Sequence, residues 1–415
     1  MLLNRRIIVG ICGGIASYKA VDLVSKLQQA GVLVDVILTE HAEEFVRPLT
    51  FATMSHRPTY SDLWEPSGEA AELHIRLAEE ADMLAIVPAT ANTIARLAHG
   101  MADNMLTAVA LATQAPLLLA PAMHSNMYTH PATQANLALL RERGVHIVEP
   151  DVGHLASGAV GPGRLPETAV LMGAIGMVLG QEGDLADRRI IITAGGTQEP
   201  IDPVRYVGNR SSGKMGYALA AEARDRGAHV ILISAPVALP APYGVELHRV
   251  ETARQMRDAV HSFFLDADVL IMSAAVADFR PARSAAQKIK KDGRTGDQAS
   301  DGDLTVHMVK NPDILEELMI LEEEQDRAQS SRRRCIRVGF AAETEHIVEY
   351  AQEKLRKKRL DLLIANDVSR PDSGFGSDTN KILILHTNNV ENLPVMPKSA
   401  VAAAILDRVV SLLDA

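Results

Sequence analysis

The chain has few cysteines, few aromatic residues and no long apolar segment. Its 415 residues include two cysteines, Cys12 and Cys335, which argues against a disulfide framework and favours a reducing compartment such as the cytoplasm. No run approaches the roughly 20 apolar residues that a membrane-spanning helix needs, and the N-terminus shows no signal-peptide pattern. We therefore expect a soluble, cytoplasmic protein without a membrane partner.

Basic residues are also in the minority. The 42 Lys and Arg residues against 52 Asp and Glu residues give a formal net charge of −10, which argues against nucleic acid as a partner. Local lysine clusters can still bind small anions. The apolar fraction of 47% supports compact folds, and this length fits two domains of roughly 200 residues each.

Two segments share one pattern, in which an apolar β-branched strand ends in glycines and leads to an amphipathic helix. The first runs from residue 6 through Gly13 and Gly14 to a helix at about 17–30. The second runs from residue 189 through Gly195 and Gly196 and a long loop to a helix at about 213–226. Unpaired amides and the helix dipole converge at such openings and often bind a phosphate. The sequence thus predicts two nucleotide-type sites in two domains.

Short apolar strands alternate with helices in both halves, which predicts an α/β protein with two doubly wound parallel sheets. The expected strands are 6–11, 34–38, 83–87 and 116–120, then 189–193, 229–234, 268–272, 336–340, 361–365 and 382–386. The expected helices of the first half are 17–30, 41–54, 69–79, 91–99, 103–112 and 132–143. We place the first domain at 1–180, a linker at 181–187 and the second domain at 188–415. Composition predicts a glycine-rich flap at 153–163 and mobile or solvated insertions at 292–303 and 322–334.

Small residues follow the strands of the first half, at the sheet edge where open α/β sheets bind ligands. The small hydroxyl and amide side chains at these strand ends suit the phosphate and ring edge of FMN; the candidate FMN-binding residues are Gly13, Gly14, Ile15, Ala16, Thr39, Pro88, Ala89, Thr90, Asn92 and Met123. The full G-x-G-x-x-G fingerprint is missing, so a tight turn without a ligand would look the same. His74 precedes the next strand, and a solitary histidine is more often structural than catalytic.

At these positions the first half resembles the flavin-containing cysteine decarboxylases. The shared motifs are G-G-I-A-x-Y-K from Gly13, L-H-I around His74, P-A-T-A-N-T-I-A-R-L-A-x-G-M-A-D-N from Pro88, P-A-M-H-S-N-M-Y from Pro121 and G-P-G-R-L from Gly161. The resemblance implies that His74 is the catalytic base. It also implies that the loop 121–128, with His124, Asn126 and Met127, holds the substrate carboxylate.

Two positions depart from that family. Many relatives have asparagine where His124 stands, and a proton-donating cysteine in the flap where this chain has Ser157. A hydroxyl is a far poorer acid than a thiol, so direct replacement should weaken reprotonation of an enethiolate. Either another group protonates it, or this half is slower or stops at the oxidised product. Asn126, two positions along, is a candidate for the missing amide, and a flavin-binding regulatory module without turnover stays an alternative.

In the second half, Ser211, Ser212 and Gly213 place hydroxyls and amides at a predicted helix start, which suits an anion, although ordinary capping looks the same. The segment is not a Walker A loop, because the first glycine is missing and a long loop precedes it. After the strand at 268–272, the small Ser273, Ala274 and Ala275 leave room for a ring or sugar beside Asp278.

Lysines follow in three groups. Lys288 opens a K-I-K-K run, and Lys310 opens the run Lys310, Asn311, Pro312, Asp313 and Ile314. Such runs are usually solvated, but here they follow a strand end in an acidic protein, as triphosphate binding requires. Lys354 and Lys358 are four residues apart on a predicted helix and can point at one anion.

Residues 188–410 closely resemble phosphopantothenate-cysteine ligases. The shared motifs are I-T-A-G-G-T-x-E-P-I-D-P-V-R, N-R-S-S-G-K-M-G, A-A-V-A-D-F, K-I-K-K, K-N-P-D-I, V-G-F-A-A-E-T and A-N-D-V. Both halves together resemble the bacterial bifunctional synthetase/decarboxylases of coenzyme A biosynthesis. This implies a flavodoxin-like flavoprotein domain followed by a Rossmann-like ligase domain.

The resemblance implies that 4'-phosphopantothenate and L-cysteine are joined through an acyl cytidylate made from CTP with Mg²⁺. The product is then decarboxylated with FMN to 4'-phosphopantetheine. It implies that Lys288 stabilises charge at the α-phosphate and that Asn209 orients the acyl intermediate. Nucleotide, metal and substrate binding is implied for Arg205, Asp278 (also the metal ligand), Phe340, Lys354 and Lys358.

Relatives suggest a homo-oligomer, with trimers of the flavin domain and dimers of the ligase domain, possibly a dodecamer. The residues themselves do not distinguish CTP from ATP. A dehydrogenase with two dinucleotide domains fits less well, because neither half has the full fingerprint or a well-placed ribose-binding acid.

Overall fold

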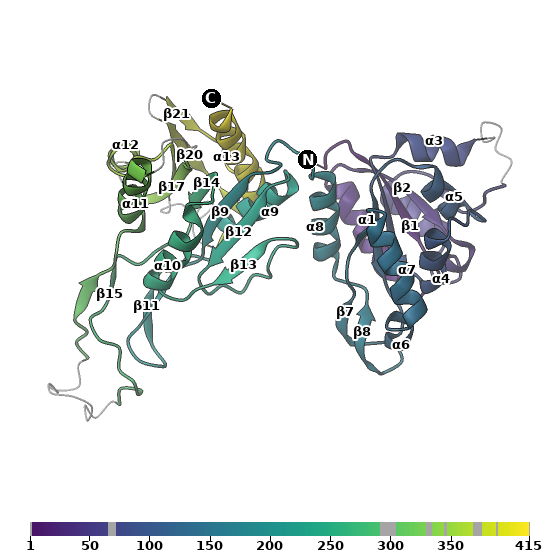
Figure 1. The fold of residues 1–415 in the computed structure, drawn as a ribbon, viewed down its shortest axis with the longest axis horizontal. Helices are drawn as coiled ribbons and strands as arrows, with labels where there is room; N and C mark the ends of the chain where they lie inside the picture. Colours follow the sequence, from purple (N-terminus) through teal and green to yellow (C-terminus); the bar gives the residue numbers. More distant parts are fainter. Residues whose placement is uncertain are drawn as a thin grey trace. The chain divides into compact units, whose positions relative to one another are not determined.

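Figure 1 shows the computed structural model of the chain, which describes residues 2–64, 72–290, 304–328, 334–343, 347–367, 376–386 and 389–414. The chain divides into two compact units, Met1–Gln181 (unit 1) and Glu182–Ala415 (unit 2). The division falls between the helix α8 (Thr168–Leu179) and the strand β9 (Arg189–Ala194), in the region where the sequence places the linker.

Unit 1 is built on a six-stranded parallel sheet. Its strands are β1 (Arg6–Ile11), β2 (Leu33–Leu38), β3 (Thr59–Tyr60), β4 (Met83–Ala89), β5 (Leu117–Pro121) and β6 (His146–Ile147), in the order β3-β2-β1-β4-β5-β6. Apart from the two-residue edge strand β3, this is the order of flavodoxin-like sheets. The order reverses between β1 and β4, which are apolar and almost wholly buried because helices cover both faces. The predicted fold class is confirmed here.

The helices of unit 1 mostly match the periodicity of the sequence. They are α1 (Ser17–Gln29), α2 (Pro48–Ser55), α3 (Leu73–Glu80), α4 (Ala91–Ala98), α5 (Met105–Ala112), α6 (Ser125–Tyr128), α7 (Pro131–Glu142) and α8. The single helix expected at 41–54 is wrong: a short 3-10 turn covers Glu40–Ala42, and α2 begins at Pro48. Proline lacks an N–H and fits only the first turn of a helix. The expected start at residue 69 lies outside the described residues.

The glycine-rich flap contains regular structure. Strands β7 (Asp151–His154) and β8 (Val160–Arg164) form an antiparallel hairpin, with Ser157 at its tip. Gly153, Gly161 and Gly163 lie within these strands, and because glycine is rare in strands they hid the strand pattern in the sequence.

Unit 2 is built on an eight-stranded sheet. Its strands are β9, β12 (His229–Ser234), β13 (Glu246–Arg249), β14 (Val269–Met272), β17 (Ile336–Glu343), β18 (Leu362–Asp367), β20 (Ile382–His386) and β21 (Asn389–Asn392), in the order β13-β12-β9-β14-β17-β18-β20-β21. The first six are parallel in the Rossmann order, and β20 and β21 are antiparallel. The Rossmann-like expectation is confirmed.

Helices cover this sheet, and the segments with β11 (Tyr206–Gly208) and β15 (Phe279–Pro281) extend away from it (Figure 1). The helices are α9 (Lys214–Asp225), α10 (Ala253–Phe264), α11 (Ile314–Ala328), α12 (Ile347–Lys357) and α13 (Lys398–Leu413). Two-stranded ribbons pair β10 (Gln198–Pro200) with β11 (Tyr206–Gly208), β15 (Phe279–Pro281) with β16 (Met308–Lys310), and β19 (Thr379–Asn380) with β22 (Met396–Pro397). Among the described helices, none combines the length and hydropathy needed to cross a membrane.

The two predicted insertions differ in outcome. The segment 292–303 lies outside the described residues, as do residues 329–333 of the second segment. Residues 322–328, however, are helical and continue α11, which the sequence did not predict. Glu322 lies 3.4 Å from the buried guanidinium of Arg337, and this ion pair ties the helix to β17.

Close packing of α9 on β9 depends on Gly216. A Cβ at this position would lie 2.6 Å from Ala194 Cβ and 2.9 Å from Thr193 O, closer than such atoms approach in proteins. The first turn of α9 therefore lies directly on the end of β9, as the third glycine of a Rossmann opening permits.

We expect Gly216→Ala to lower the unfolding free energy of unit 2 by about 1–3 kcal/mol, because the new methyl group forces helix and strand apart. Denaturant unfolding of the full chain measures this. Gly153→Ala is the control, since its methyl group would meet only Arg164 side-chain atoms at an ordinary 3.8 Å. Equal stability of both variants would contradict the packing argument.

Candidate active sites

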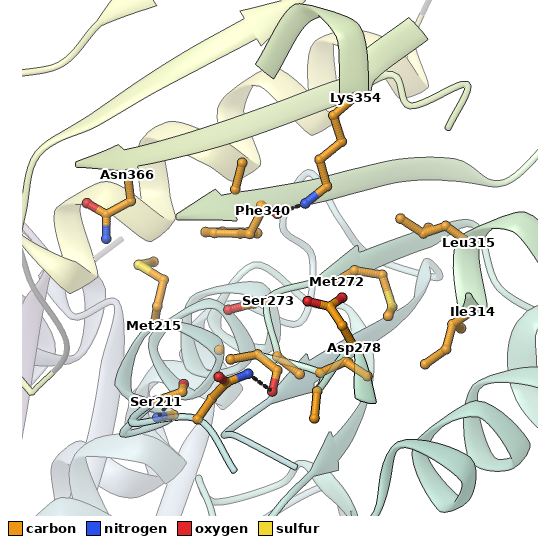
Figure 2. A pocket seen from close by; sticks show the side chains of 18 of the residues that line it. Ser211, Met215, Met272, Ser273, Asp278, Ile314, Leu315, Phe340, Lys354 and Asn366 are labelled. Atoms are coloured by element: carbon orange, nitrogen blue, oxygen red, sulfur yellow. Dashed lines mark hydrogen bonds between the residues drawn. The ribbon is translucent and has the colours of Figure 1, made fainter. Parts of the chain in front are cut away.

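Unit 2 contains a cavity of about 580 Å³ that is lined by residues of β17 and β18, of the end of β14 and of the start of α9 (Figure 2). Many residues that the sequence assigned to the second site line it: Asn209, Ser211, Ser212, Gly213, Ser273, Ala274, Ala275, Asp278, Lys310, Asn311, Pro312, Asp313, Ile314, Phe340, Lys354 and Lys358. The structure thus brings five separate sequence segments to one place. Six further residues line the cavity that the sequence did not assign to the site, although the quoted motifs contain the first and fourth of them: Lys214, Met272, Leu315, Asn366, Asn380 and Lys398.

Backbone contacts hold the loops of this cavity together. Ala275 donates its N–H to Gly195 O at 2.8 Å, and Asn209 donates its side-chain amide to Ala275 O at 3.1 Å. A Cβ at Gly196 would lie 2.7 Å from Asn209 O, so only glycine permits this approach. The Asn209 side chain is therefore fixed against the loop that carries Ala275.

The buried Asn311 holds the loop that carries Ala277 and Asp278 by hydrogen bonds. It is 6% exposed, and its side-chain amide donates to Ala277 O at 2.8 Å while its backbone N–H donates to Asp278 O at 2.8 Å. The exposed Asp278, just before β15, and the exposed Lys310, at the end of β16, are thereby held beside each other at the rim of the cavity.

The two lysines associated with α12 already have partners. Lys354 Nζ donates to Phe340 O at 2.8 Å, and Lys358 forms an ion pair with Asp313 and lies 3.7 Å from Glu316. Burial alone would raise the pKa of Asp313, but the bond and charge of Lys358 outweigh it and leave that pKa below its usual range. The positive charge of Lys358 is thus partly neutralised by a carboxylate of the protein itself.

Lys288 and Arg205 lie elsewhere. Arg205 pairs with buried Asp202, whose pKa is held well below its usual range by that guanidinium. Arg205 also donates to Ile289 O at 3.0 Å, and Ile289 N–H donates to Asp202 at 3.1 Å. This ties the exposed Lys288 segment to the β10–β11 hairpin, so the expectation that Lys288 and Arg205 line the same cavity as the other residues is not met within one chain.

Within the described part of the chain, no three His, Cys, Asp or Glu side chains are grouped to hold a metal ion. A Mg²⁺ at Asp278 would therefore take most of its oxygen ligands from nucleotide phosphates and water, as Mg²⁺ commonly does. The exposed carboxylate of Asp278 fits that mode of binding, since the other carboxylate that lines the cavity, Asp313, is paired with Lys358.

In unit 1 the assigned cofactor residues gather where β1, β2, β4 and β5 end. Thr39 donates its N–H to Ile11 O at 3.0 Å, and Ala122 donates to Ala89 O at 3.1 Å, which joins neighbouring strand ends. Pro88 and Ala89 end β4, Asn92 is exposed on α4, and Met123 follows β5. These contacts place the strand-end residues along one edge of the sheet.

The glycine turn after β1 is open on one side. A Cβ at Gly13 would overlap His41 Cβ at 2.4 Å, whereas at Gly14 the nearest atom would be Thr90 Cγ2 at 4.0 Å. Ile15 is 61% exposed beside this opening, and Ala16 is the N-cap of α1. An open turn with an exposed apolar residue and polar strand ends fits a flavin phosphate and ring.

Thr90 and Cys12 lie beneath this turn. Thr90 caps α4 by accepting from Thr93 N–H at 3.3 Å, and the Cys12 thiol donates to Thr93 Oγ1 at 3.2 Å. Burial raises the pKa of Cys12, so the thiol stays protonated and acts as a packed donor.

The flap hairpin lies on the predicted substrate loop. Met123 N–H donates to Gly163 O at 3.0 Å, and a Cβ at Gly163 would lie 2.0 Å from Met123 O. His124 Nδ1 accepts from Asn126 N–H at 3.2 Å and caps α6, whereas the side chains of Asn126 and Met127 are exposed. The exposed Ser157 Oγ accepts from Ala159 N–H at 3.4 Å. His74 is half-buried at the second position of α3.

Comparison with known proteins covers both units. The model of the flavoprotein family matches residues 1–180, and that of the DNA/pantothenate metabolism flavoprotein C-terminal domain matches 185–413. The coenzyme A biosynthesis bifunctional protein CoaBC of Vibrio vulnificus strain YJ016 is 46% identical over 413 residues, 99% of each chain. The chain belongs to the CoaBC family.

Other members of the CoaBC family match along their whole length. The Escherichia coli K12 protein is 42% identical over 413 residues (100% of this chain, 98% of that one), and the Bacillus subtilis 168 protein is 44% identical over 416 residues (99% and 98%). The resemblance drawn from the motifs is confirmed, and the chain is a bifunctional enzyme of coenzyme A biosynthesis with a flavoprotein domain and a ligase domain.

We expect Gly163→Ala to reduce decarboxylation at least tenfold while ligation continues, because the methyl group overlaps Met123 O and displaces the flap from the loop 121–128. Release of CO₂ and of pyrophosphate from the full chain measures the two activities. Gly153→Ala, in the same hairpin but with room for a methyl group, should keep both. Unchanged CO₂ release by Gly163→Ala would show that the flap contact is dispensable.

Proposed function

We propose that unit 2 joins 4'-phosphopantothenate to L-cysteine with CTP and Mg²⁺, and that unit 1 decarboxylates the product with FMN to give 4'-phosphopantetheine. The cavity of unit 2 carries this proposal, since hydroxyls, small residues, an aromatic ring and lysines from distant segments line one space. It is large enough for a nucleotide and part of a second substrate.

Ligation requires activation, because a free carboxylate is a poor electrophile. The carboxylate of 4'-phosphopantothenate attacks the α-phosphorus of CTP, pyrophosphate leaves, and the cysteine amine then displaces CMP from the acyl cytidylate. Asn209, fixed by Ala275 O, orients the acyl group, and Phe340 offers its ring to the nucleotide. Mg²⁺ at Asp278, when bound, would neutralise phosphate charge.

Lys288 supplies positive charge at the α-phosphate in this mechanism. Since it is exposed and tied to the β10–β11 hairpin, it must approach the cavity from that exposed segment or from a second copy of the chain. Arg205 holds the segment by its bonds to Asp202 and Ile289 O.

We expect Lys288→Gln to abolish CTP-dependent pyrophosphate release, because the developing phosphate charge is then uncompensated. The assay supplies the intact chain with 4'-phosphopantothenate, cysteine and either CTP or ATP. Lys290→Gln is the control, being an exposed lysine of the same run. The flavin absorbance of the protein should persist in both variants; retained ligation by Lys288→Gln would remove the proposed role.

In unit 1, the strand-end residues Thr39, Thr90 and Met123 and the open turn at Gly14 would hold FMN. FMN, when bound, would supply the two-electron chemistry that decarboxylation of a cysteine side chain requires. His74 acts as base towards the substrate, and the loop 121–128 holds its carboxylate under the flap hairpin. His124, with Nδ1 occupied by Asn126 N–H, offers its Nε2–H to that carboxylate as a donor.

Ser157 is the flap residue at the position of the proton donor in related decarboxylases. We expect Ser157→Cys to increase the ratio of 4'-phosphopantetheine to the oxidised enethiol product, because a thiol is the stronger acid. Mass spectrometry of products from phosphopantothenoylcysteine measures the ratio, with Ser157→Ala as control. Equal ratios in all three proteins would show that protonation does not pass through this position.

We also propose a cytoplasmic homo-oligomer, with trimers through unit 1 and dimers through unit 2. Exposed apolar side chains on the ribbons of unit 2 support self-association, since Val204 is 60%, Tyr206 55% and Phe279 55% exposed. The unpaired cysteines Cys12 and Cys335 are compatible with a reducing compartment.

A further inference from the structure

Two lysines that the sequence did not assign to a site, Lys214 and Lys398, meet at one corner of the cavity of unit 2. Lys214 begins α9 and Lys398 begins α13, and both line the cavity of about 580 Å³. Both also line an adjoining cavity of about 360 Å³, together with Tyr217 and Asp378. We call this place the Lys214–Lys398 corner.

One short segment holds both ammonium groups. Lys214 Nζ donates to Gly376 O at 2.8 Å and to Asp378 Oδ1 at 2.6 Å, and Lys398 Nζ donates to Ser377 O. Lys398 N–H also donates to Asp378 O at 3.0 Å. Burial, and after it the charge of Lys214, lowers the pKa of Lys398, so the two cations are close enough to repel each other.

The counter-charge at this corner is easily exchanged. The Asp378 side chain is 90% exposed, whereas Asp313, which pairs with Lys358 elsewhere in the cavity, is 34% exposed. An exposed ion pair contributes little, because water and salt compete with it. A ligand anion can therefore replace Asp378 on Lys214 at small cost, and the two lysines retain an excess of positive charge for it.

The corner is separate from the lysines associated with α12. In Figure 2, Ser211 and Met215, which flank Lys214 in the chain, lie on the side of the cavity away from Lys354. Lys354 is bonded to Phe340 O, and Lys358 is paired with Asp313. A substrate that spans the cavity thus meets positive charge at both ends.

We propose that the Lys214–Lys398 corner binds a phosphate group of a ligase substrate. A phosphate offers several strong acceptor oxygens and two negative charges, which suits two ammonium groups and the hydroxyl groups of Ser211 and Ser212 beside them. The inference rests on the proposed function, in which two substrates carry phosphate. The candidate groups are the β- and γ-phosphates of CTP and the 4'-phosphate of phosphopantothenate.

The experiment uses the full chain with Lys214→Met, Lys398→Met and Lys214→Arg. Lys357→Met is the matched control, an exposed lysine that does not line the cavity. Pyrophosphate release gives KM for CTP, 4'-phosphopantothenate and cysteine separately, and calorimetry gives direct binding of inorganic pyrophosphate and of 4'-phosphopantothenate. Flavin absorbance and CO₂ release report on unit 1.

We expect each methionine variant to raise one phosphate-dependent KM at least tenfold, with the other two within twofold and Lys214→Arg close to the unchanged protein. A rise for CTP with weaker pyrophosphate binding assigns the corner to the nucleotide. A rise for 4'-phosphopantothenate, with a smaller preference over pantothenate, assigns it to that substrate.

Two results would overturn the proposal: no KM changing more than twofold, or all three rising together with a lower melting temperature, which marks a structural role. If the unchanged protein does not ligate with CTP, the proposed function fails. Calorimetry would then still test the corner.

Discussion

The cavity of unit 2 depends on an approach between backbones that side chains would prevent. Gly196 lets Asn209 O come within 2.7 Å of the place where a Cβ would stand, and Gly216 lets α9 rest on the end of β9. Ala275 then bonds to Gly195 O and receives the amide of Asn209. These contacts join loops that follow the strand ends, through main-chain groups and the side-chain amide of Asn209, and so hold the loops in position before any ligand arrives.

Charge within the cavity is distributed unevenly for a related reason. Lys358 is 13% exposed and needs a partner that is also partly buried, which Asp313 supplies. Lys214 lies nearer solvent and is paired with a carboxylate on the surface. Lys358, the more buried cation, is thus paired with the partly buried Asp313. Lys214 is paired with the exposed Asp378, which a phosphate can replace.

The fold was largely predictable from two patterns. Buried parallel strands are continuous apolar runs, and in the helices that cover them an apolar residue recurs every three to four positions. The errors have local causes. The apolar periodicity suggested a helix from residue 41, whereas α2 begins only at Pro48. Glycines within β7 and β8 concealed these two strands. Glu322 was expected in a mobile or solvated insertion, whereas it lies on α11 and pairs with the buried Arg337.

Sequence alone determined the two glycine openings, the strand-end residues and the family, because each depends on short runs of neighbouring residues. Tertiary structure decided which of those residues share a space. Lys310, Lys354 and Lys358 line one cavity. Lys288 does not line it, because its neighbour Ile289 is hydrogen-bonded to Asp202 and Arg205 between β10 and β11. Lys214 and Lys398 are 184 positions apart and have no motif in common, and they meet because α9 and α13 pack together in unit 2. Such pairing follows from how helices and strands pack in three dimensions, which local sequence does not encode.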